Sequence, residues 1–185
     1  MDVKLEKWHK CKVDIEVLKE LSKKSDLKGL QHISVFFGLL IITGLLAYIT
    51  WGTWWSVFWF LVYGNIYSFS NPLWHETGHK TAFKSKFLNE FFYYLSSFMA
   101  NFEPTRWRYS HFVHHGNTYS IENPFDHEIE YGNDLKETPK RLIINIIPFL
   151  DLVFIKKHIS FEIFQHAFGI KTKVMEDCIP ENAQA

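Results

Sequence analysis

The stretch "ISVFFGLLIITGLLAYITWGTWWSVFWFLVYGNIYSF", residues 33–69, decides the fold of this 185-residue chain. It lies inside a longer segment, between Lys28 and Glu76, that contains no Asp, Glu, Lys or Arg. A helix needs ~20 mainly apolar residues to cross a bilayer, so the run is long enough for two crossings. Two buried helices of a soluble all-α protein are the alternative, but soluble helices rarely lack a polar stripe for so long.

The run predicts a two-helix transmembrane hairpin over residues 33–70, with 33–49 as the first helix and 54–70 as the second. Between them, "TWGTWW" places one glycine among three tryptophans, as is typical of a turn in the interfacial belt of a membrane. Eight lysines lie in the first 28 residues and further basic residues follow Glu76, whereas the turn is uncharged. This distribution predicts that both ends of the hairpin lie in the cytoplasm.

Residues 1–32 are expected to form a cytoplasmic amphipathic segment. They contain no early apolar core, so they are not a signal peptide. Val13, Val17, Leu18 and Leu21 are spaced as one face of a short helix, which would either lie on the membrane or cap the domain. The formal net charge is zero, with 20 basic and 20 acidic side chains, which argues against a nucleic-acid partner.

Beyond the hairpin, residues 71–131 form a histidine-rich region and residues 132–185 are predicted to form interfacial helices. The apolar stretch at 91–102 is too short to span, so we expect it at the interface or inside the domain. The apolar stretch at 142–155 contains Pro148 and Asp151, which argue against a spanning helix. The predicted class is an all-α membrane protein, with a transmembrane hairpin followed by a cytoplasmic helical region.

Five histidines form two clusters in that region. "HETGHKTAF" places His75 and His79 four residues apart, and "HFVHH" contains His111, His114 and His115. On a helix these spacings bring the imidazole rings of each cluster to one face. Neutral imidazole is a ligand for Zn, Cu, Fe and Ni, so the sequence predicts a metal site built from these five side chains. The isolated histidines are treated as ordinary core or surface residues: His9, His32, His158 and His166.

The first cluster can also be written HExxH, the signature of zinc metalloproteases, in which Glu76 would act as the general base. Such an enzyme needs one further ligand and a water-filled cleft, and it gives no role to a second cluster of three histidines. Here the cluster directly follows a predicted membrane crossing. A membrane protease and a non-catalytic membrane module therefore remain as alternatives.

The combined pattern resembles the membrane fatty acid desaturase superfamily, whose members have an apolar hairpin, then HxxxH, HxxHH and a distant third HxxHH. "HETGHKTAF" looks like the first box of its bacterial branch, including the Thr81-Ala82-Phe83 tail. "RYSHFVHHGNT" and "NPFDHEI" look like the second box and its following acidic segment. The resemblance implies two iron ions, O2, a lipid or acyl substrate, and a ferredoxin or cytochrome b5-like electron donor. A hydroxylase or ketolase on the same scaffold is the nearest alternative.

One feature departs from the resemblance, because this sequence contains no third HxxHH motif. In the superfamily, that box and a second hairpin come further along the chain. We therefore expect the sequence to be the N-terminal portion of a longer enzyme, with a partner chain that completes it as the alternative. Five histidines cannot furnish two irons, so the chain alone is expected to bind iron weakly and to be inactive.

Acidic neighbours are candidates for supporting the ligands, because a ligating histidine usually donates its other N–H to a carboxylate or carbonyl. The candidates are Glu76, Asp126 and Glu128. Solvated surface charges would give the same pattern. His127 is expected to be a loop residue. Arg106 and Arg108 would either meet lipid phosphates or only enforce the topology.

Overall fold

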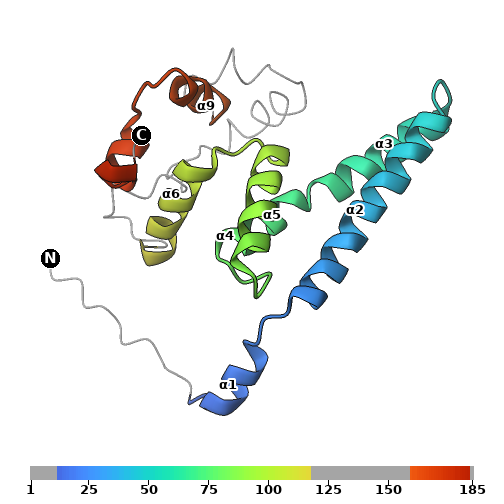
Figure 1. Cartoon of the computed structure of the whole chain (residues 1–185). Helices are drawn as coiled ribbons and strands as arrows, with labels where there is room; N and C mark the ends of the chain where they lie inside the picture. The colour runs from blue at the N-terminus through green and yellow to red at the C-terminus, as the bar shows by residue number, and fades with distance from the viewer. Residues whose placement is uncertain (1–11, 118–158, 184–185) are drawn as a thin grey trace, which may run out of the picture.

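The computed structural model describes residues 12–117 and 159–183, and within these ranges the chain forms helices and no strands. The elements are α1 (Ile15–Leu21), α2 (Asp26–Ile49), α3 (Trp54–Tyr67), α4 (Ser70–Gly78), α5 (Lys86–Met99), α6 (Pro104–Asn117), α9 (Ile159–Ala167), α10 (Lys173–Cys178) and the short 3-10 helix η1 (Glu181–Ala183) (Figure 1). The predicted all-α class is therefore confirmed for the described part. The predicted acidic segment after the second box and the stretch 142–155 lie outside the described residues.

Helices α2 and α3 pack side by side as a helical hairpin that extends away from the other elements (Figure 1). Their contact uses small residues. Thr43 and Ala47 of α2 and Ser56 of α3 are buried, and a Cβ atom on Gly44 would lie 3.4 Å from the ring of Tyr63. Small residues let two helix backbones approach closely. Such packing is typical of helices in membranes, where the hydrophobic effect does not drive helices together.

Within the described residues, α2 is the one helix that is long and apolar enough to cross a membrane, with 24 residues and a mean hydropathy of 2.1. At 1.5 Å per residue it is about 36 Å long, which exceeds the ~30 Å hydrocarbon core. α3 has 14 residues. It is therefore only about 21 Å long. The prediction of two spanning helices is thus not confirmed, since only the first has the required length.

The bounds of the hairpin helices differ from the predicted ones for identifiable reasons. α2 begins at Asp26 rather than at residue 33, because the Ser25 hydroxyl caps it by accepting from the N–H of Lys28. α3 ends at Tyr67 rather than near residue 70, and α4 begins at Ser70. Pro72 causes this break, because proline cannot donate to the carbonyl of Ser68 and would clash with it in a continuous helix.

The core lies where the N-terminal half of α2 meets α4, α5 and the loop between them. It contains Ile33, Leu73, Phe83 and Phe92, and the fully buried ring of Phe83 stacks on Phe92 at 5.3 Å. The same loop is tied to α2 by the N–H of Ser85, which donates to the Asp26 carboxylate. The predicted short apolar stretch thus lies largely in α5, which buries Phe92 and Tyr93 against the domain and leaves Phe91 and Phe98 exposed.

α1 forms where the sequence predicts a short amphipathic helix, but it buries none of its residues. Its apolar side chains Val17, Leu18 and Leu21 are all exposed. α1 therefore does not cap the described part of the domain, and its placement on a membrane surface stays a prediction.

The described C-terminal helices contact α6. α10 packs against it, and the guanidinium of Arg106 forms an ion pair with Glu162 of α9 at 3.2 Å. Arg106 is buried. Neither predicted role of its charge explains this position, since contact with lipid phosphates and enforcement of the topology both require an exposed side chain. It ties α9 to the second histidine helix.

Candidate metal centre

The first histidine pair lies at the C-terminal end of α4. His75 belongs to the last turn, and His79 is the capping residue that follows Gly78. Lys80 then adopts a left-handed conformation, with φ of 58°, which turns the chain away from the helix axis. The two imidazoles lie one turn apart on the same face, with ring centroids separated by 4.6 Å. The predicted spacing thus produces the expected geometry.

The second pair lies on α6, which is started by a side-chain cap. The Glu103 carboxylate accepts hydrogen bonds from the backbone N–H groups of Thr105 and Arg106. One helical turn again separates His111 and His115, whose ring centroids are 4.5 Å apart.

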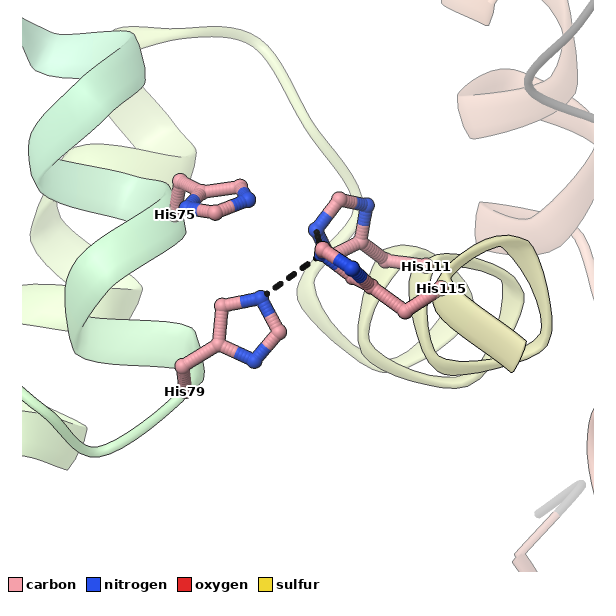
Figure 2. A group of neighbouring side chains, drawn as sticks. All are labelled: His75, His79, His111 and His115. Carbon is pink, nitrogen blue, oxygen red and sulfur yellow. Dashed lines mark hydrogen bonds between the residues drawn. The ribbon is translucent and has the colours of Figure 1, made fainter. Parts of the chain in front are cut away.

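The two pairs face each other across the gap between α4 and α6 (Figure 2). His79 Nε2 lies 3.2 Å from His115 Nε2, and His115 Nε2 lies 3.0 Å from His111 Nε2. One nitrogen from each of the four rings, His75 included, lies within 4.8 Å of the others. The sequence predicts one site built from five histidines, and the fold brings four of them into one group.

The two Nε2–Nε2 distances of 3.2 and 3.0 Å match those between neighbouring ligands of one metal ion. Two imidazole nitrogens bound at about 2.1 Å are about 3.0–3.4 Å apart in octahedral or tetrahedral geometry. His115 Nε2 contacts two other imidazole nitrogens, whereas one nitrogen of a neutral imidazole either donates or accepts a hydrogen bond. A cation that accepts all the lone pairs is chemically suited to this donor set, which contains nitrogen and no carboxylate, as borderline transition metals prefer.

The surroundings of His79 keep its ring nitrogens available. Partial burial, followed by the proximity of His75, His111 and His115, lowers the pKa of His79 below its ordinary value. A lowered pKa favours the neutral ring at neutral pH. The neutral ring is the form that binds metal.

His114, the fifth predicted ligand, lies outside the group of four. Its ring centroid is 5.8 Å from that of His111 and 5.8 Å from that of His115. The reason is angular, because on α6 its side chain projects about 100° around the helix axis from that of His115. His114 is therefore beside the cluster rather than part of it.

Glu76 is exposed on α4, next to His75 in sequence. Its backbone carbonyl accepts hydrogen bonds from the N–H and hydroxyl of Thr81, while within the described part of the chain its carboxylate makes no hydrogen bond. The other two candidate carboxylates, Asp126 and Glu128, and also His127, lie outside the described residues.

A small pocket opens beside the histidines, and its walls are largely aromatic. Trp74, Tyr93, Trp107 and Phe112 line it together with three of the four clustered histidines. The ring of Trp74 is buried and its centroid lies 5.4 Å from that of His111. Aromatic surface therefore borders the cluster on this side, while His79 and His115 are exposed.

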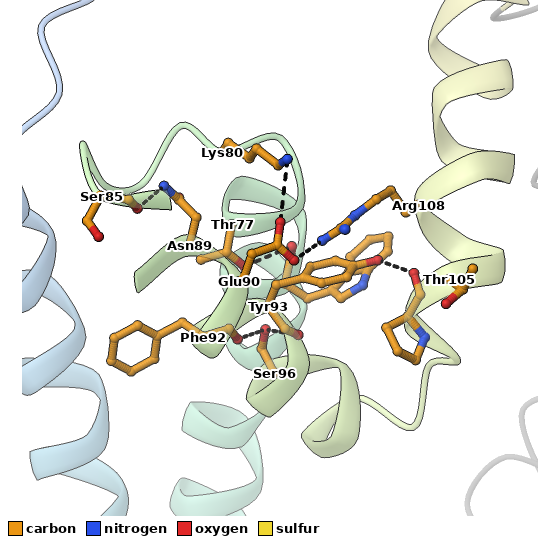
Figure 3. A network of polar contacts seen from close by, with 12 residues as sticks. Thr77, Lys80, Ser85, Asn89, Glu90, Phe92, Tyr93, Ser96, Thr105 and Arg108 are labelled. Atoms are coloured by element: carbon orange, nitrogen blue, oxygen red, sulfur yellow. Dashed lines mark hydrogen bonds and ion pairs between the residues drawn. The ribbon is translucent and has the colours of Figure 1, made fainter. Parts of the chain in front are cut away.

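Three polar side chains that support the site come from α5 and carry no motif. Asn89 and Tyr93 are buried, and Glu90 pairs with basic residues of both neighbouring segments (Figure 3). Glu90 is the only acidic residue within α5. An isolated carboxylate in an otherwise apolar helix is the one signal by which the sequence could have indicated a partner.

Comparison with known proteins adds one finding. A protein-family model described as fatty acid desaturase matches residues 49–172, which is more than half of the chain and includes all four clustered histidines. No curated protein and no solved structure matches the chain.

Proposed function

The chain belongs to the fatty acid desaturase family, and on this premise we propose that it provides the first metal-binding half of an oxygen-dependent, iron-containing acyl-lipid desaturase. Enzymes of this family modify fatty acids by desaturase- or hydroxylase-type oxidation. The observation that carries the proposal is the convergence of His75, His79, His111 and His115 beside an aromatic pocket.

These four side chains would hold an iron ion by their imidazole nitrogens. With O2 and two electrons from an external donor, the bound iron supplies an oxidant strong enough to remove hydrogen from an unactivated carbon chain, which no side-chain acid or base can do. The reaction balances when the acyl chain loses two hydrogen atoms and O2, with the two donated electrons and two protons, becomes two molecules of water. The part of the protein is to fix the ligands and to exclude water from the aromatic side.

A second iron requires ligands beyond the four. His114 lies one helical turn or less from His111 and His115 and is the nearest candidate. We propose that it binds the second ion together with residues outside the described ranges or on a partner chain. On this basis the chain binds one ion more readily than two.

The substrate and the electron donor follow from the same proposal. Apolar side chains such as Leu39, Ile42 and Leu45 are exposed on α2, which fits a helix surrounded by lipid. The histidine helices lie at the base of the hairpin, where basic flanks indicate the cytoplasmic side. An acyl chain would reach the site from the bilayer, and a ferredoxin or cytochrome b5-like protein would supply electrons from the cytoplasm.

Two other classes of enzyme could use some or all of the same histidines. A hydroxylase or ketolase would use the same four ligands and differ only after the first hydrogen is removed. A zinc protease would use His75, His79 and one further ligand with Glu76 as base, so it would leave at least one of His111 and His115 without a role, although both lie in the cluster. The four-histidine group therefore favours an oxidase.

Metal binding by the chain in lipid nanodiscs tests the proposal. We expect anaerobically added Fe(II) to bind to the wild-type chain and to be lost from the His75→Ala and His111→Ala variants alike. Equal loss from both variants requires that the two pairs share an ion. Binding that depends on His75 but not on His111 would contradict the proposal and favour the protease arrangement.

A further inference from the structure

The two helices that carry the histidine pairs are both supported by α5. α4 packs against one side of it, and α6 also contacts it. The relative position of the two pairs therefore depends on how α4 and α6 are each fixed to α5. A side chain of α5 that contacts both α4 and α6 near the histidines therefore directly affects the distance between the two pairs.

Glu90 is such a side chain. One carboxylate oxygen, Oε1, lies 3.5 Å from the ammonium group of Lys80, the residue that follows His79. The other oxygen, Oε2, accepts a hydrogen bond of 2.8 Å from the guanidinium of Arg108, which lies one helical turn before His111 (Figure 3). A single carboxylate thus links the end of the first histidine helix to the second.

The surroundings of Glu90 hold it in this bridging state. Its partial burial alone would raise the carboxyl pKa, but the hydrogen bond and charge of Arg108 outweigh that effect and lower the pKa below its ordinary value of 4.5. Arg108 is fixed in turn, because its guanidinium lies 4.3 Å from the centroid of the Tyr93 ring. The carboxylate is charged at neutral pH and faces two cations.

We propose that Glu90 is a positioning residue that sets the separation of the two histidine pairs and thereby the affinity of the metal centre; this inference rests on the proposed function. The side chain of Glu90 is 34% exposed. Partly exposed ion pairs contribute little to overall stability. Its effect is therefore expected in the geometry of the cluster, where nitrogen atoms must lie within a few tenths of an ångström of bonding positions, rather than in the folding of the chain.

The substitution Glu90→Gln tests the proposal with minimal change of shape. The amide oxygen can still accept one hydrogen bond, but the neutral group no longer attracts both Lys80 and Arg108. With Co(II) as the spectroscopic probe, we expect the dissociation constant to rise about 3- to 10-fold, in the range of coupling between contacting residues, and the ligand-field absorption to change. Glu16→Gln is the matched control, because Glu16 forms an ion pair with Lys19 on α1, far from the site.

A second readout does not require metal. Spin labels on Asn71→Cys in α4 and Gly116→Cys in α6 report the distance between the two helices, in a chain whose native cysteines are changed to serine. Both positions are exposed, and a side chain at Gly116 meets open space. We expect a narrow distance distribution with Glu90 present and a broader one with Glu90→Gln.

The outcomes separate this inference from the proposed function. If the wild-type chain binds Co(II) and Glu90→Gln leaves the affinity, the absorption and the distance distribution unchanged, the inference is overturned while the metal centre stands. If the wild-type chain binds no Co(II), the proposed function fails, and an unbroadened distribution would then overturn the helix-positioning claim as well. If Glu90→Gln loses helical circular dichroism, Lys80→Gln is used instead, because it removes the ion pair between Lys80 and Glu90. Co(II) binding and the spin-label distance distribution are then measured on that variant.

Discussion

Asn89 shows how one buried side chain holds the loop that follows the first histidine pair. The loop between α4 and α5 has no regular structure, so its buried backbone groups need other partners. Asn89 supplies them, because its amide accepts a hydrogen bond from the N–H of Phe83 and donates to the carbonyls of Phe83 and Ser85. The loop residue Phe83 can then bury its ring completely in the core.

The substitution Asn89→Ala is expected to destabilise the protein by about 2–4 kcal/mol, since each buried group left without a partner costs about 1–3 kcal/mol. Thermal unfolding in detergent micelles, followed by circular dichroism, measures the change. Asn71→Ala, at an exposed position of α4, is the control and should change little. A loss below about 0.5 kcal/mol in Asn89→Ala, the range of ordinary surface substitutions, would show that the loop does not depend on this side chain.

Tyr93 is expected to make the free energy of unfolding fall at alkaline pH. Burial of its phenol raises the pKa from the ordinary value of 10.0 to about 12, although Arg108 acts in the opposite direction. A group with a raised pKa in the folded state contributes stability below its unfolded pKa and loses it as pH rises through the folded pKa. Stability should therefore fall between pH 10 and pH 12, by an amount on the order of 3 kcal/mol for two pKa units.

Chemical unfolding across this pH range, compared between the wild-type chain and Tyr93→Phe, measures the effect of the phenol. The phenylalanine variant lacks the hydrogen bond that the Tyr93 hydroxyl donates to the Pro104 carbonyl, so it should be less stable at neutral pH and show a flatter profile above pH 10. Identical alkaline profiles for the two proteins would assign the loss to other groups.

At the scale of elements, the approach of α2 to the loop before α5 depends on a glycine. A Cβ atom on Gly29 would lie 2.6 Å from the ring of Phe83 and 2.7 Å from the carbonyl oxygen of Ala82. The nearest atoms thus include backbone and a ring that is itself packed in the core. No flexible side-chain end is available to move aside.

Gly29→Ala should therefore destabilise the protein, because overpacking of about 1–3 kcal/mol exceeds the gain of at most about 1 kcal/mol in helix propensity. Gly38→Ala in the same helix is the matched control, since a Cβ there meets nothing within 4 Å and only the gain in propensity remains. Melting temperatures of the two variants should shift in opposite directions. A shift of the same sign and size in both would contradict the close approach.

The elements also show what the sequence could and could not predict. The spacing of His75 with His79 and of His111 with His115 predicts rings on one helix face, and both pairs have that geometry. Periodicity cannot predict that the two pairs meet, because that depends on how α4 and α6 pack on α5. The same limit explains why Glu90 was missed, since its partners are distant in sequence.

In the whole molecule, the proposed function requires the α2–α3 hairpin to lie in lipid and the histidines to lie at its cytoplasmic base. The tip of the hairpin, with Trp51 and Trp54 exposed, is far from α4 and α6, which carry the histidines (Figure 1). Tryptophan is enriched at the headgroup level of membranes. Because α3 has only 14 residues, the side of the membrane on which this tip lies distinguishes a spanning hairpin from one that stays in one leaflet.

Single cysteines at Thr53 in the turn and at Lys84 in the loop before α5 locate the two ends of the hairpin; both positions are exposed. In intact cells of a bacterial expression host, a membrane-impermeant thiol reagent should label Thr53→Cys from outside and label Lys84→Cys only after permeabilisation. Labelling of both positions from the same side would show a hairpin that enters and leaves one leaflet.

The most direct measurement of the central claim is X-ray absorption at the iron edge of the Fe(II)-loaded chain in nanodiscs. We expect a first shell rich in imidazole nitrogen, supplied by both His75–His79 and His111–His115, and a loss of bound iron in His111→Ala as large as in His75→Ala. A shell dominated by oxygen, or iron retained without His111, would contradict the claim that two helices share one metal.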